Sequence, residues 1–179
     1  MQAFMQTALV GDSTPGIPFN DVYFANTDGN FFLDDPAKTR IDPNHPIREI
    51  RVSSGWIVDG VAVDYNDAQN NRTITMKHGS SFPGAAKVTL GAQENVISVF
   101  GRAGYQTYYK RNMVNSIGFV IFDQERATVR VVGPFGNSNS SNEGTPFSAS
   151  NVMAFGGFAQ ETAQLGLSGL FFMKPANKQ

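Results

Sequence analysis

The chain has 179 residues, a formal net charge of -1, 41% hydrophobic and 16% charged residues, and no cysteine. This length fits one domain with a sizeable core, the near-neutral charge without a basic run excludes a nucleic-acid footprint, and no apolar span could cross a membrane. The lack of cysteine excludes disulfides and thiolate metal sites and, with an N-terminus that lacks a signal pattern, predicts a cytoplasmic protein.

Residues 26–46 are rich in Pro, Asp and Asn and are predicted to be a surface insertion within a single domain that spans residues 1–179. Beyond them, apolar and polar residues alternate in short runs bounded by Gly, Asn, Pro and Ser. The runs predict strands at residues 50–53, 61–64, 73–77, 87–90, 96–100, 117–122, 127–132, 151–155 and 167–173. Such alternation is typical of an all-β protein, and no segment has the period of an amphipathic helix.

Three segments share one plan, in which a short apolar strand, a glycine-containing turn and a second strand follow one another. They span residues 49–65, 97–114 and 151–172, and each is accompanied by a separate Gly-containing loop at 10–16, 78–84 or 133–139. Repeated units of this kind stack to bury a common core. The three copies therefore predict a three-sided body with pseudo-threefold symmetry.

The turn of the first repeat carries the only tryptophan of the chain together with a carboxylate, in the order Gly55-Trp56-Ile57-Val58-Asp59. The residues alone allow two interpretations of this pairing. Asp59 could bond to its own turn backbone and Trp56 could pack into the core, as such residues commonly do. Alternatively, both side chains could face a ligand that has an apolar face and polar edges.

The sequence contains few of the residue combinations that catalysis requires. A glycoside hydrolase needs two carboxylates facing one another across a bond, and the only adjacent acidic pair, Asp34-Asp35, lies in the predicted insertion. His45 and His78 are the only histidines, which argues against catalytic triads and zinc sites. We therefore expect no enzyme activity, no metal and no cofactor.

Six short motifs, in order and spacing, resemble the jacalin-related lectins of the mannose-binding type, from about residue 9 to residue 173. They are IREIRVSSGWIVDGVAVDY (47–65), HGS (78–80), VISVFGRAG (96–104), GPFG (133–136), TPF (145–147) and VMAFGG (152–157), and the opening VGDSTPGIPFND (10–21) is similar too. The resemblance implies a β-prism of three four-stranded antiparallel sheets, each a Greek key. This fold agrees with the threefold repeat.

Members of this family hold a sugar in a Gly-x-x-x-Asp turn, and residues 55–59 match that form. The resemblance implies that Asp59 accepts two sugar hydroxyls, because a carboxylate forms strong charge-assisted hydrogen bonds. It also implies that the amides of Ile57 and Val58 donate, and that Trp56 offers its flat face to the sugar. Glycine at position 55 would allow a sharp turn and a close approach of the ligand.

In the family, a glycine-rich loop lies beside the sugar-binding turn. The loop His78-Gly79-Ser80 is expected to take this place here. It would supply a further donor to the sugar, namely an amide of Gly79 or Ser80.

The other two repeats depart from the family pattern. The usual site lies in the last repeat, where this chain has neither the glycine nor the aspartate, so we predict a weak or inactive second site. Its residues would be Gln160, Glu161, Thr162 and Gln164. The middle repeat also lacks an acid; Tyr105, Tyr108 and Tyr109 could form an aromatic platform there, but we expect them to pack between strands.

The resemblance favours glycans that contain mannose or glucose as partners, because the galactose-preferring branch depends on a chain cleavage that is not evident here. A shallow site for one sugar binds weakly, so useful avidity predicts a homodimer or larger homo-oligomer. Neither a nucleic acid nor membrane insertion is expected. The alternative is a jacalin-like protein-interaction module that has lost sugar binding.

Overall fold

The computed structural model describes residues 4–22, 24–25, 31–32, 41–68, 71–81, 83–138, 140, 142–160 and 166–176, and every regular element among them is a β-strand. No helix in this part of the chain is long and apolar enough to cross a membrane. Of the predicted insertion, Phe31–Phe32 form β5, which pairs with β4 (Phe24–Ala25). Ile41 is fully buried and bridges to Asp67, so the last part of this segment packs into the fold.

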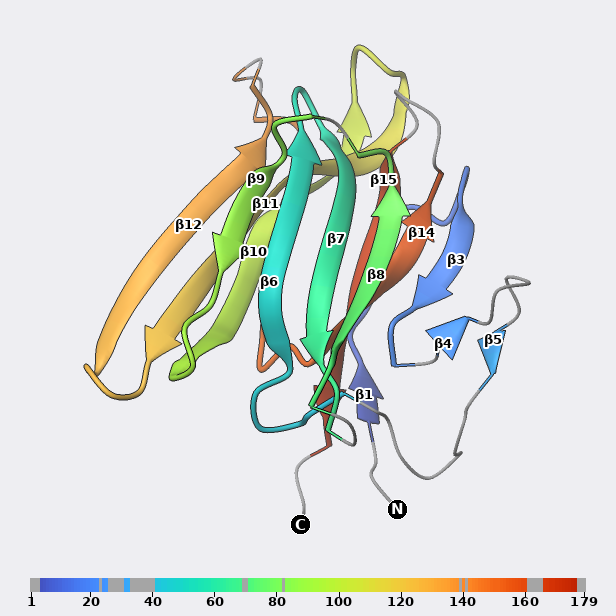
Figure 1. The fold of residues 1–179 in the computed structure, drawn as a ribbon. Coiled ribbons are helices and arrows are strands. Elements are labelled where there is room, and N and C mark those ends of the chain that lie inside the picture. The colour runs from blue at the N-terminus through green and yellow to red at the C-terminus, as the bar shows by residue number, and fades with distance from the viewer. Residues whose placement is uncertain are drawn as a thin grey trace.

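Apart from the β4–β5 pair, the described strands form three antiparallel sheets, each four strands wide (Figure 1). The first sheet has the order β1-β15-β14-β3, built from β1 (Phe4–Gln6), β15 (Leu167–Pro175), β14 (Ala154–Ala159) and β3 (Ile17–Asn20). The second has the order β8-β7-β6-β9, built from β8 (Thr73–Gly79), β7 (Val58–Asn66), β6 (Ile47–Ser54) and β9 (Ala86–Thr89). The third has the order β12-β11-β10-β13, built from β12 (Thr128–Gly136), β11 (Arg111–Asp123), β10 (Glu94–Gln106) and β13 (Thr145–Ser150).

The connections within the sheets confirm the predicted β-prism. In the second and third sheets, three consecutive strands are followed by a fourth that returns beside the first, which is a Greek key. The first sheet is completed by both ends of the chain, because β1 and the short β2 (Val10–Gly11) pair with β15 one after the other along the same edge. The three sheets thus repeat one arrangement, as the sequence repeats predicted.

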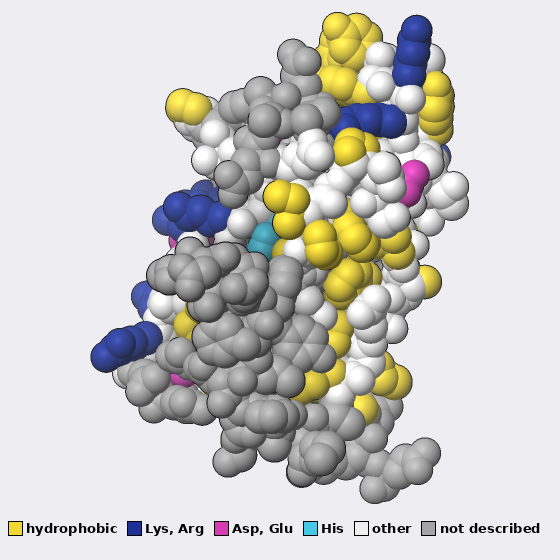
Figure 2. All heavy atoms as spheres, turned by 90° about the vertical axis from the view of Figure 1, so that its right-hand side faces the viewer, with side chains coloured by type: hydrophobic (Ala, Val, Ile, Leu, Met, Phe, Trp, Pro, Cys, Tyr) yellow, Lys and Arg dark blue, Asp and Glu magenta, His cyan; other side chains and the backbone are white. Residues whose placement is uncertain are grey.

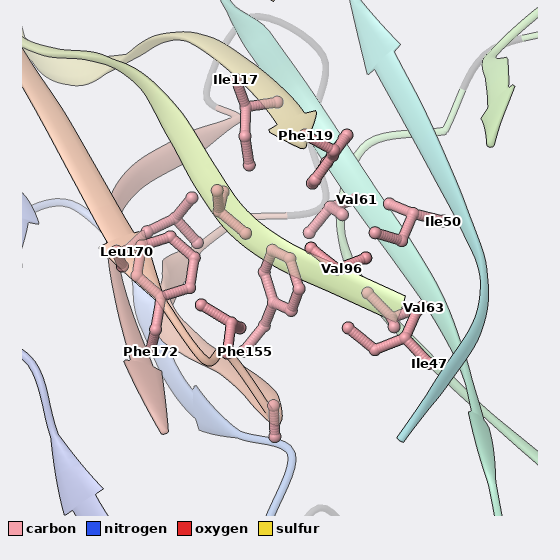
Figure 3. Packing of buried hydrophobic residues seen from close by; sticks show 14 of the residues in the cluster. Ile47, Ile50, Val61, Val63, Val96, Ile117, Phe119, Phe155, Leu170 and Phe172 are labelled. Atoms are coloured by element: carbon pink, nitrogen blue, oxygen red, sulfur yellow. The ribbon is translucent and has the colours of Figure 1, made fainter. Parts of the chain in front are cut away.

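The core lies between the inner faces of the sheets. Alternation directs every second side chain inward, so Ile50 and Val52 are buried while Arg51 between them is not. Figure 3 shows side chains from all three sheets meeting there, among them Ile50, Val61, Val63, Ile117, Phe119, Phe155, Leu170 and Phe172. Full burial of one such side chain contributes about 1.5–3 kcal/mol, so the core holds the strand ends in fixed positions.

The turns of the three repeats gather at one end of the prism. Figure 1 shows the β6–β7 and β10–β11 connections at the top of the molecule, where β14 also ends and β15 begins, opposite the two termini. The antiparallel pairing within each hairpin places these turns there, because consecutive strands reverse direction at the same end. This end is where the candidate site residues lie.

Candidate functional site

A β-bulge places Asp59 at the start of β7. Ser53 pairs with Gly60 but the next residue, Ser54, pairs with Val58, so Asp59 is the extra residue on its strand. Bulges bend a strand and change the direction of a side chain, and they are common beside functional sites. The turn itself is closed by a hydrogen bond of 2.9 Å from the Gly55 amide to the Ile57 carbonyl oxygen.

The carboxylate of Asp59 is enclosed but has no partner side chain within the described residues. Asp59 is only 8% exposed. Burial raises the pKa of its carboxyl from 3.8 to about 6, and a hydrogen bond from its own backbone amide opposes this only in part. At neutral pH the ionised group is therefore poorly solvated and poorly compensated. An acceptor in this state gains from any ligand that donates hydroxyl hydrogens to it.

The predicted neighbouring loop lies directly beside Asp59. The Ser80 amide donates to the Asp59 carbonyl oxygen at 2.9 Å, and Gly79 pairs with Gly60. Both glycines are required by this contact, since a Cβ on Gly60 would lie 2.0 Å from the Ser80 carbonyl oxygen and one on Gly79 would lie 2.4 Å from that of Asp59. The Ser80 amide is thus engaged, and the alternation of the ladder turns the Gly79 amide away from β7, which leaves Gly79 as the candidate donor.

His78 faces the interior and not the turn. Its Nε2 lies 2.6 Å from Oδ1 of the buried Asp21, whose Oδ2 accepts a hydrogen bond of 2.6 Å from the Tyr65 hydroxyl. The ring stacks on Phe19 with centroids 3.6 Å apart. His78 therefore joins the N-terminal segment to the second sheet, and its contribution to the loop is structural. Its place on the inner face of β8, in register with Ile74 and Met76, was a signal of this role in the sequence.

Trp56 lies on the surface, so the interpretation that buried it in the core is wrong. Trp56 is 42% exposed. Its ring makes an edge-to-face contact with the ring of Tyr108, with the two centroids 4.7 Å apart. The expectation that the tyrosines of the middle repeat pack between strands is also wrong for two of them, since Tyr105 and Tyr108 are 56% and 66% exposed. Tyr105 pairs with Asn112 near the end of the long β10–β11 ladder, and Tyr108 lies in the turn that follows its last pair.

The turn is held from its other side by residues that sequence reasoning missed. The amides of Asn137 and Ser138 donate to the carbonyl oxygens of Trp56 and Gly55 at 3.2 and 3.0 Å. The third Gly-containing loop therefore serves the first repeat. Only the spatial arrangement of the sheets shows this, because some 80 residues separate the two segments.

Gly55 behaves differently from the glycines around it. A Cβ at this position would meet nothing within 4 Å. The turn itself therefore does not need glycine, and the missing side chain leaves open space at the surface. This space adjoins Trp56 and is free for a ligand.

Gly166, immediately before the last strand, lies close to Asp59. A Cβ on Gly166 would lie 2.9 Å from the Val58 carbonyl oxygen, and the Gln160 amide donates to the Gly166 carbonyl oxygen at 3.1 Å. Of the residues predicted for a weak second site, Gln160 is described, whereas Glu161, Thr162 and Gln164 lie outside the described residues. In the part of the chain that is described, no group of three or more His, Asp or Glu residues is placed to hold a metal ion.

Comparison with known proteins supports this arrangement of turns and sheets. The model of the jacalin-like lectin domain matches residues 24–167. No curated protein sequence matches the chain.

Solved structures show the same fold. The chain is similar to a mannose-specific jacalin-related lectin from Morus nigra in complex with mannose, at 20% identity and a TM-score of 0.68, over 98% of this chain and 97% of that one. A mannose-binding lectin from champedak is 19% identical over 99% of both chains, with a TM-score of 0.68. A mannose-binding jacalin-related lectin from Ananas comosus is 19% identical over 97% of this chain and 99% of that one, with a TM-score of 0.65. The family model covers well over half of the sequence, and the chain therefore belongs to the jacalin-like lectin family, whose members are carbohydrate-binding proteins rather than enzymes.

Proposed function

We propose that this lectin binds mannose- or glucose-type sugars at the turn formed by residues 55–59. The observation that carries the proposal is the enclosed carboxylate of Asp59, which has no partner side chain among the described residues, beside the exposed ring of Trp56. Vicinal sugar hydroxyls would donate to the two oxygens of Asp59 and replace the missing solvation. The apolar face of the sugar would cover Trp56.

The backbone around Asp59 supplies the remaining polar groups. The amides of Ile57 and Val58 lie on the same turn, and Gly79 lies on the loop that contacts the Asp59 carbonyl group. Because Gly55 leaves open space, a sugar ring can approach this backbone closely. The similar lectins from Morus nigra and champedak are described as mannose-specific and mannose-binding, which supports mannose as the first ligand to test.

Assembly and location belong to the same proposal. One shallow site binds a monosaccharide with roughly millimolar to tens-of-micromolar affinity, about -4 to -6 kcal/mol. A homodimer or larger homo-oligomer would then supply avidity. The predicted cytoplasmic location rests on composition and stays a prediction.

The test is a calorimetric titration of mannose into the wild type, Asp59→Asn and Glu125→Gln. Asp59→Asn keeps the shape of the side chain and removes its charge, so affinity should fall at least ten-fold, as expected for loss of charge-assisted hydrogen bonds. Glu125→Gln removes one charge from an exposed residue in the β11–β12 connection and should leave affinity unchanged. Trp56 is the only tryptophan, so its fluorescence gives a second reading from the proposed turn.

Two results would contradict the proposal. Equal affinity of the wild type and Asp59→Asn would move the site to another turn, first of all the one at 160–164. No binding of mannose, glucose or galactose by the wild type would favour the alternative function, a jacalin-like module that interacts with proteins and has lost sugar binding.

A further inference from the structure

An exposed aromatic row extends from the proposed sugar-binding turn onto the hairpin of the middle repeat. Trp56 meets Tyr108 with ring centroids 4.7 Å apart, and Tyr108 meets Tyr109 with centroids 5.2 Å apart. Both contacts are nearly perpendicular, at 87° and 84°, so each ring is held by the edge or face of the next. We call these three rings the aromatic row.

The aromatic row is exposed at the end of the prism where the turns gather. Tyr108 is 66% exposed and Trp56 is 42% exposed, so both leave much of their surface to solvent. Figure 2 shows hydrophobic side chains at the top of the molecule, at the end where Figure 1 places the β10–β11 hairpin. Large aromatic rings held in contact with one another and left in water are unusual on a monomer and indicate a binding surface.

The aromatic row adjoins the acceptor of the proposed site. Trp56 lies on the same turn as Asp59, three residues before it. At the other end, burial and then the charge of Asp59 raise the pKa of the Tyr109 phenol, which agrees with a position near that carboxylate. The row therefore begins on the turn that carries Asp59 and ends at a tyrosine that senses the charge of Asp59, and Tyr108 between them is more exposed than Trp56.

A single hexose cannot cover this surface. A hexose ring is about the size of one aromatic ring, whereas the row contains three rings, two of them on a different hairpin from Asp59. The tyrosines also add hydroxyl groups that can donate to or accept from sugar hydroxyls. The chemistry of the row thus matches a chain of sugars, which repeats an apolar face and a polar rim.

We propose that Tyr108, which adjoins Trp56 of the first site, forms a second subsite, and that the protein's ligand is an oligosaccharide whose first sugar binds at Asp59 and whose next sugar stacks on Tyr108. This inference rests on the proposed function. It assigns a ligand-contacting role to the middle repeat, which has no acid of its own. It also explains why the tyrosines there point outward.

The test compares mannose with a set of linear mannotrioses that differ in linkage, each titrated by calorimetry and by Trp56 fluorescence. The wild type should bind at least one mannotriose about five- to ten-fold more tightly than mannose, the gain expected from one stacking contact. Tyr108→Ala should lose that gain and keep the affinity for mannose. Tyr108→Phe keeps the ring and should keep the gain.

Tyr105→Ala is the matched control, because Tyr105 is an exposed tyrosine on the same hairpin but makes no ring contact with the described aromatic residues. It should bind both ligands as the wild type does, and thermal unfolding of all variants checks that they fold. Mannotrioses that bind no more tightly than mannose, or a gain that survives Tyr108→Ala, would overturn the second subsite and leave the proposed function intact. A wild type that binds none of these sugars would overturn both.

Discussion

Asp21 and Asp59 are both almost completely buried, and the β8 segment that contacts one also contacts the other. The Asp21 carboxylate is satisfied on both oxygens, by the Tyr65 hydroxyl and by His78. The Asp59 carboxylate is paired only with its own backbone amide among the described groups, and burial raises its pKa to about 6. A buried charge that is fully paired holds the fold together, whereas one left without a partner costs stability and is retained where it has another use. The difference identifies Asp21 as structural and Asp59 as the candidate ligand acceptor.

Removing the structural carboxylate of Asp21 should change the stability of the protein more than any other substitution considered below. Asp21→Ala leaves the Tyr65 hydroxyl and the His78 ring without their buried acceptor, and the free energy of unfolding should fall by about 3 kcal/mol. Chemical denaturation of this variant and of Glu125→Ala, a surface control, measures the difference. A loss below about 0.5 kcal/mol, the range of ordinary surface changes, would show that the network is dispensable.

The close backbone contact between β7 and the Ser80 loop, beside Asp59, should be the next most sensitive to substitution. Gly60→Ala places a Cβ 2.0 Å from the Ser80 carbonyl oxygen and should destabilise the protein by about 2 kcal/mol as β7 and β8 separate. Gly55→Ala is the control, since a Cβ there meets nothing within 4 Å, and its stability should change by less than about 0.5 kcal/mol. Equal thermal stability of the two variants would argue against the close strand approach.

Asp59→Asn should act on stability in the direction opposite to Asp21→Ala. Removing a poorly solvated charge should raise the free energy of unfolding at pH 7 by about 1–2 kcal/mol. The folded-state pKa is raised from 3.8 to about 6, so the cost of the charge is absent well below pH 3.8, grows between pH 3.8 and about 6, and is nearly constant above that range. The stability gap between variant and wild type should therefore close as the pH falls from 7 to 4. A gap independent of pH would assign the effect to packing.

The same titration should appear in sugar binding. Only the ionised carboxylate accepts two hydroxyl hydrogens, so the affinity for mannose should fall roughly ten-fold between pH 7 and pH 5 if its pKa is about 6. Any residual binding by Asp59→Asn should lack this dependence. Calorimetry at four pH values measures the affinity of the wild type and of Asp59→Asn for mannose. A wild-type affinity that does not change with pH would show that Asp59 is not the acceptor.

Much of the site was predictable because its parts are close in sequence or lie on adjacent strands. The turn at 55–59 is a local feature, and the loop at 78–80 follows one hairpin later, so pairing of β7 with β8 brings the two together. The strand register determined the directions in which the side chains of the site point. Alternation along β8 places His78 on the inner face, where it contacts Asp21, and a bulge opposite Ser53 and Ser54 sets the direction of Asp59.

The sequence by itself determined an all-β chain with three similar strand–turn–strand units, because alternation, glycine and turn residues act over a few positions. It also determined which turn retains a carboxylate beside a tryptophan. Only the tertiary structure decided that Asp59 is enclosed without a partner side chain among the described residues, that Asn137 and Ser138 hold its turn, and that Trp56 and Tyr108 form one exposed surface. These properties depend on how three sheets close around a common core, which joins residues far apart in the chain and sets the solvation of each group.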